Sequence, residues 1–242
     1  MNVHTQLRAR PALSSRVRLR EVPEQARWLA AGLVLAFAVP FVFADLAGLQ
    51  RDLYYALYVA FVFTFVGVWA RRTQQPVRAF VTRRWPWGVS LGAGAGALLT
   101  LIVLNEPATS HPHGLTFAGA ILWRGVVYGA ADGLLLSAFP ILAVFALFAS
   151  KPLRERSKRA VAGIGALALV VSLLFTAGYH AGYADFRGGK IARPLTGDVM
   201  WSVPTLVTLS PLGTPIAHVA THVTAVVHSY DTDVFLPPHE PK

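Results

Sequence analysis

The chain has 242 residues, of which 54% are apolar and only 14% charged. Because a soluble domain usually carries about a quarter charged residues, this composition argues against an ordinary soluble fold. The absence of cysteine excludes disulfides, thiolate metal sites and cysteine nucleophiles. A net charge of +10 would normally suggest nucleic acid as a partner. In so apolar a chain, basic loops instead set membrane orientation, so we expect a lipid bilayer and no nucleic acid as the partner.

Six apolar runs are long enough to cross a bilayer, since about 20 helical residues span a ~30 Å hydrocarbon core. The sequence therefore predicts an all-α integral membrane helix bundle, with five to six transmembrane helices. Residues 1–27 form a basic arm, 28–230 the membrane domain and 231–242 a short polar tail. The apolar runs cover residues 28–44, 53–70, 86–104, 115–150, 160–183 and 200–230.

Basic residues concentrate in three segments: the arm, the loop 71–84 and the loop 151–159. Together these segments carry 16 of the 22 lysine and arginine residues, whereas the loops 45–52 and 105–114 hold one arginine and three acids. Cytoplasmic loops are enriched in lysine and arginine. We therefore expect a cell (inner) membrane protein with its N-terminus in the cytoplasm.

Two stretches do not fit simple crossings. The run 115–150 must cross once but is too long, so residues 115–129 are predicted to form a separate half-helix at the outer leaflet. In the last run, prolines and Gly213 interrupt the apolar sequence. This segment either crosses a sixth time or turns back at residues 211–215.

Glycines recur at four-residue spacing around Gly92, Gly129 and Gly178. Such spacing lets helices approach closely, either within the chain or in a homodimer or with another membrane protein. Aromatic residues at the ends of two spans predict membrane-interface belts. These residues are Trp85 and Trp87 at the inner end, and Tyr54, Tyr55 and Tyr58 at the outer end.

Four histidines lie in apolar sequence, and three of them are candidate ligands on the predicted outer half of the bilayer. His218 and His222 are four residues apart and share a helix face, and His180 comes from another helix. Two such imidazoles and a third ligand suit zinc or another divalent metal. Three alternatives stay open: structural histidines in a non-catalytic scaffold, a metal site, or a bis-histidine haem.

Three further ionisable residues are candidates for catalysis, because such groups are costly in apolar segments and tend to be functional. Arg124 could snorkel to the outer headgroups, and Asp132 could pair with a histidine inside the bundle. Arg124 and Asp132 are too far apart along a helix to pair directly. Asp185, five residues past His180, could act as a ligand, as a base or as a plain interfacial acid.

Three short motifs resemble those of the CAAX-protease and bacteriocin-processing (CPBP) family of intramembrane proteases. Residues 119–129 resemble its first motif, Thr176–His180 its second and His218–His222 its third. The resemblance implies a metallohydrolase whose histidines hold the ion. Gly119 and Ala120 stand where the family has two glutamates, one of them its general base, which implies a remodelled member.

Overall fold

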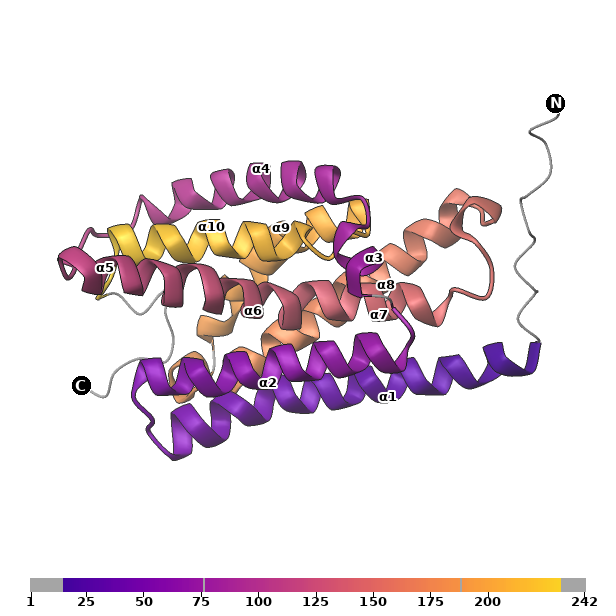
Figure 1. Ribbon diagram of the computed structural model, residues 1–242, viewed down its shortest axis with the longest axis horizontal. Helices are drawn as coiled ribbons and strands as arrows, with labels where there is room; N and C mark the ends of the chain where they lie inside the picture. The colour runs from indigo at the N-terminus through magenta and orange to yellow at the C-terminus, as the bar shows by residue number, and fades with distance from the viewer. Residues whose placement is uncertain (1–14, 76, 188, 232–242) are drawn as a thin grey trace, which may run out of the picture.

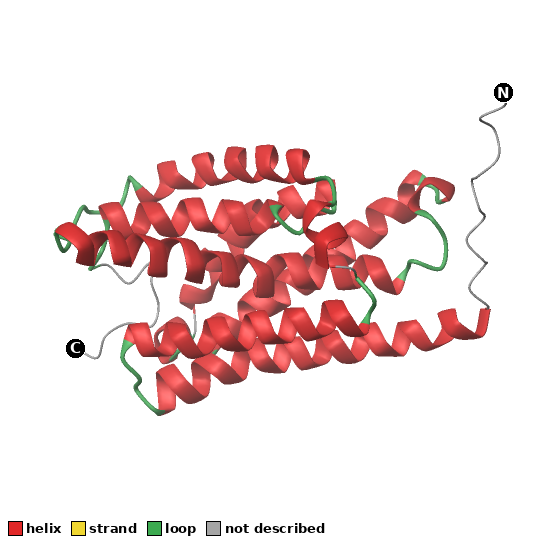
Figure 2. Ribbon diagram, in the orientation of Figure 1, coloured by secondary structure: helices red, strands yellow, loops and turns green. Residues whose placement is uncertain are grey.

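The computed structural model describes residues 15–75, 77–187 and 189–231. Most of the predicted basic arm and nearly all of the polar tail, with His4 and His239, lie outside these ranges. The described part consists of helices joined by loops and contains no strand (Figures 1 and 2). An all-α bundle is therefore confirmed.

Five helical segments among the described residues are long and apolar enough to cross a membrane. They mark the chain as a membrane protein and correspond to the first five apolar runs. Their ends alternate between a "basic end", which holds the loops 73–84 and 148–157, and the "opposite end" (Figure 1). The segments are α1 (Ser15–Val39) with η1 (Pro40–Leu46), α2 (Arg51–Arg72), α4 (Trp85–Val103), Gly114–Leu147 and α8 (Lys158–Ala181).

The predicted half-helix is not a separate element. Gly114–Leu147 is one helical segment of 34 residues, about 51 Å long at 1.5 Å per residue. Two stretches of π-helix lie within it. Its parts are α5 (Gly114–Ala120), η2 (Ile121–Tyr128), α6 (Gly129–Gly133), η3 (Leu134–Ala138) and α7 (Phe139–Leu147).

The last apolar run turns back, as one of the two sequence interpretations expected. It forms a hairpin of α9 (Ala192–Thr208) and α10 (Gly213–His228). Arg193 pairs with Glu106 at the opposite end, whereas Arg84 at the basic end donates to the Thr208 carbonyl. The α10 helix then returns, and His228 bonds the backbone carbonyl of Glu106 at 2.9 Å. Both ends of the hairpin therefore lie at the opposite end of the bundle.

Glycines allow α10 to pack closely against two neighbours. Gly92 and Gly96 of α4 face Gly213 and Ala217 of α10. On the other side, Gly129 lies against His222, and two further glycines of the long helix also meet α10. Gly178 and Gly182 face α1 and η1 in the same way. All three glycine stripes thus pack against other helices of the same chain.

This packing predicts that Gly92→Ala destabilises the protein, because the new methyl group would collide with the carbonyl oxygen of Gly213. The expected loss is about 1–3 kcal/mol, as for other overpacked sites. The matched control is Gly94→Ala on the same helix, where an added Cβ meets nothing within 4 Å. Thermal unfolding in detergent, followed by circular dichroism, should separate the two variants. Equal stability of both would contradict the packing role.

Candidate metal centre

One buried group of metal-ligating side chains joins Asp132, His218 and His222. Their exposed fractions are 6%, 2% and 5%. Asp132 lies on α6, and the two histidines lie one turn apart on α10. One ligand atom from each residue can be chosen so that all three lie within 4.8 Å of one another. Asp132, for which the sequence interpretation expected a histidine partner, is thus buried next to both histidines.

The distances within this group suit a shared cation better than direct hydrogen bonds. Asp132 Oδ2 lies 3.5 Å from His218 Nδ1 and 3.4 Å from His222 Nε2. An N–H···O hydrogen bond is normally 2.7–3.2 Å long. Two ligand atoms bonded to one tetrahedral ion at about 2.0–2.1 Å lie roughly 3.3–3.4 Å apart. Two of the three separations are therefore close to the edge length of a tetrahedral metal site, and the two histidine ligand atoms lie within 4.8 Å of each other.

Three of the four imidazole nitrogens of this group lack a hydrogen-bond partner in the described part of the chain. Both ring nitrogens of His218, and Nδ1 of His222, are buried and unpartnered. Burying a polar atom without a partner costs about 1–3 kcal/mol. A bound cation would satisfy His218 Nδ1.

Aromatic neighbours fix the orientation of the three ligands. The Tyr58 hydroxyl donates to Asp132 Oδ1 at 2.9 Å, which leaves Oδ2 to face the histidines. Trp201 lies against the His218 ring with centroids 4.4 Å apart, and Tyr128 meets the His222 ring edge to face. Outer contacts of this kind set ring orientation and ligand basicity in metal sites.

The group lies deep inside the bundle. The helix α6 packs against both α10 and α2 (Figure 1). His218 comes five residues after the start of α10 at Gly213, and His222 comes six residues before its end at His228. The two histidines thus straddle the middle of α10, rather than lying near the outer face as the sequence suggested.

His180 does not belong to this group, so the structure brings together Asp132, His218 and His222 rather than the predicted three histidines. The His180 Nδ1 atom lies 2.8 Å from the Thr176 carbonyl oxygen of its own helix, and its ring contacts Tyr179 and Phe186. Asp185, the other candidate near it, is exposed on the short helix η5 (Ala184–Phe186).

Arg124 is buried rather than snorkelling to the membrane surface, with 8% of the residue exposed. Its guanidinium forms two hydrogen bonds with the Asp52 carboxylate, at 2.8 and 2.7 Å, and lies over the Tyr230 ring. Such a bidentate pair is geometrically specific. This pair joins the long helix to the start of α2. Arg124 therefore pairs with Asp52 and not with Asp132, as the sequence spacing predicted.

Six of the seven tyrosines gather beside the candidate metal centre. The belt prediction for Tyr54, Tyr55 and Tyr58 is wrong, because all three are fully buried. The Tyr183 hydroxyl lies 2.7 Å from the hydroxyls of both Tyr54 and Tyr179, and Tyr179 in turn bonds Tyr128. Mutual hydrogen bonding explains how several phenols are tolerated in the interior. Trp85 and Trp87 remain exposed, as a belt requires.

A second buried carboxylate, Asp198 of α9, was missed from the sequence. It accepts a hydrogen bond from Ser137 at 2.6 Å, and the Ser172 hydroxyl lies 3.0 Å from its other oxygen. The hydroxyl of Ser202, one turn further along α9, lies within hydrogen-bonding distance of both the Ser172 hydroxyl and the Asp198 carboxylate. The four-residue spacing of Asp198 and Ser202 was a detectable signal of a polar helix face.

Comparison with family models, curated proteins and solved structures finds no match for this chain. The resemblance to the CPBP family therefore stays a prediction. In the structure, its third motif supplies His218 and His222, whereas the carboxylate beside them is Asp132, beyond the first motif.

Proposed function

We propose that the protein is an integral membrane metalloprotein in which Asp132, His218 and His222 hold one divalent cation. The observation that carries this proposal is the convergence of three buried ligand atoms, with Asp132 Oδ2 at 3.4–3.5 Å from a nitrogen of each histidine. Ionisable groups in apolar segments are costly to bury and usually functional.

The donor set favours zinc or iron(II) among divalent metals. Two imidazoles and one carboxylate form catalytic zinc sites and also the triad of non-haem iron oxygenases. A bis-histidine haem would use His180 with His218 or His222. It is disfavoured because His180 lies outside the group, with its Nδ1 atom 2.8 Å from the Thr176 carbonyl oxygen. A scaffold with structural histidines is the remaining alternative, and it predicts no bound metal.

A metallohydrolase is the second candidate, because three protein ligands leave a tetrahedral ion one open position, as catalytic zinc sites do. At that position the metal would lower the pKa of a bound water towards about 7. Asp132 would then be a ligand rather than the base, and Tyr58 would keep its second oxygen engaged. The resemblance to CPBP proteases points to the same class of chemistry.

We also propose that the basic end faces the cytoplasm of a cell (inner) membrane protein, with the N-terminus on that side. Two of the three basic segments, the loops 73–84 and 148–157, lie at this end, where the described part of α1 also begins, and the hairpin of α9 and α10 opens at the other. The positive-inside bias supports this orientation.

Elemental analysis of the purified full chain should find about one zinc or iron per chain. Asp132→Ala, His218→Ala and His222→Ala should each lose most of that metal, because three ligands are the minimum set here. His180→Ala is the matched control, since His180 is a partly buried histidine outside the group, and it should keep the metal. Circular dichroism checks that each variant folds. If His218→Ala fails to fold, His218→Gln takes its place as the variant that removes this ligand. A metal-free wild type would favour the scaffold.

An open coordination position predicts a spectroscopic response. Cobalt(II) substituted into the wild-type protein should give visible bands typical of four- or five-coordination. These bands should shift on addition of azide, which would occupy the open position. Bands that do not shift with azide would indicate a structural site without an open position. That result would contradict the hydrolase but not metal binding.

The proposed orientation can be tested because the chain has no native cysteine. Ala108→Cys, in the loop at the opposite end, should react with a membrane-impermeant thiol reagent added to intact spheroplasts. Arg154→Cys, an 86% exposed side chain at the basic end, should react only after permeabilisation. The reverse labelling pattern would overturn the orientation.

A further inference from the structure

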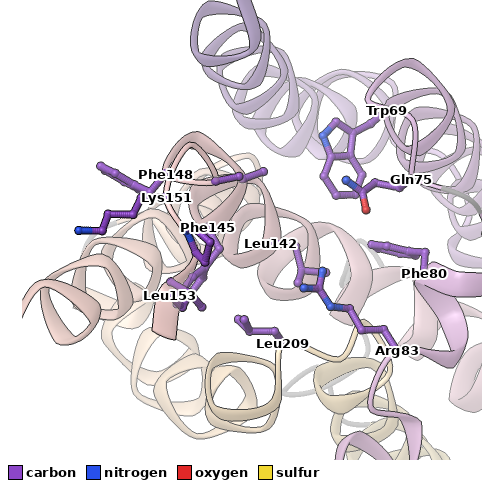
Figure 3. Close-up of a pocket in the computed structure, with 13 residues that line it drawn as sticks. Trp69, Gln75, Phe80, Arg83, Leu142, Phe145, Phe148, Lys151, Leu153 and Leu209 are labelled. Atoms are coloured by element: carbon purple, nitrogen blue, oxygen red, sulfur yellow. The ribbon is translucent and has the colours of Figure 1, made fainter. Parts of the chain in front are cut away.

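A second candidate binding site, unrelated to the metal group, lies at the basic end of the bundle. It is a pocket of about 240 Å³ between α2, α3 (Val77–Thr82), α7 and the turn joining α9 to α10 (Figure 3). Pockets that enclose a small molecule usually measure about 300–1,000 Å³. This one would therefore enclose only part of a ligand, with the remainder outside it.

The walls of the pocket are mostly apolar and aromatic. Trp69 near the end of α2 and Phe80 of α3 form one side, and Phe145 of α7 lies on another (Figure 3). Trp69 is held in place by a hydrogen bond from its indole nitrogen to Gln25. Such walls suit hydrocarbon, and they lie where α2 leaves its apolar run, three residues before its last residue.

The rim of the pocket is positively charged. Arg83 reaches across it towards Leu142, whereas Lys151 lies at the outer edge with its amine directed away from the pocket (Figure 3). None of its 13 lining residues is acidic. Arg83 and Lys151 form no ion pair with any carboxylate in the described part of the chain. An anion could therefore bind without displacing an internal partner.

The pocket combines apolar walls with a positively charged edge, and it lies where the apolar run of α2 ends. A ligand that fits it therefore has both an apolar part and an anionic part. We propose that this pocket binds a membrane lipid with an anionic phosphate headgroup. Arg83 contacts the phosphate, Lys151 adds positive charge at the outer edge of the pocket, and the first part of an acyl chain lies against Trp69, Phe80 and Phe145. The rest of the lipid stays in the bilayer, which accounts for the small volume of the pocket.

Native mass spectrometry of the full chain, titrated with dihexanoyl phosphatidylglycerol, tests the role of the charges. The variant R83Q/K151Q should bind this lipid roughly tenfold or more weakly, given the contribution of each cation near a membrane surface. The matched control R78Q/R154Q removes two cations from the same segments but outside the pocket, and should bind like the wild type. Equal weakening in both variants would overturn the site in favour of diffuse attraction.

A second variant separates a lipid from free phosphate. Ala146→Phe fills the pocket from α7 without changing charge, and should weaken phosphatidylglycerol binding. Ala149→Phe, at the exposed edge of the pocket, replaces it if the first variant fails to fold. Dihexanoyl phosphatidylcholine should bind more weakly than phosphatidylglycerol, and equimolar inorganic phosphate should not displace the lipid. Displacement by phosphate, or unchanged binding in both filled variants, would overturn the lipid assignment.

Discussion

The close approach of α10 to its two neighbours is the constraint on which the candidate metal centre depends. Gly129 lies against His222, so α10 and the long helix are separated by little more than their backbones. Asp132, almost one turn beyond Gly129, is thereby brought beside both histidines. In a bilayer, where lipid is as apolar as a leucine side chain, small residues favour such packing through dispersion contacts. The site exists because these helices lack side chains where they meet.

The interior of this bundle is unusually polar, and its polar groups satisfy one another. Tyrosine hydroxyls bond to each other, Asp198 accepts from serines, and Arg124 pairs with Asp52. Without water in a hydrocarbon core, unsatisfied groups would be expensive. The unpartnered nitrogens of His218 and His222 depart from this pattern. Three of the buried atoms without a hydrogen-bond partner therefore belong to the candidate metal centre, and the Tyr55 hydroxyl beside it is another.

The basic loops and the candidate metal ligands lie at different positions along the bundle. The two most basic loops of the described chain lie at one end, where Arg83 and Lys151 border a pocket with apolar walls, whereas the candidate metal ligands lie between α6 and the middle of α10. The turn of the α9–α10 hairpin contributes Leu209 to the pocket, and the same hairpin carries Asp198 and both histidines. The hairpin that turns back inside the bundle therefore serves both candidate sites.

The sequence alone determined the class of protein and five of its spans, because apolar length and the distribution of basic residues are local properties. It also indicated that His218 and His222 share a face, and that Asp132 and Arg124 have separate partners. Only the tertiary structure decided that Asp132, rather than His180, joins the two histidines. It also decided that Tyr58 is buried against Asp132, and that the last run forms a hairpin. These features depend on which helix faces meet and at what depth, and helical periodicity does not encode either.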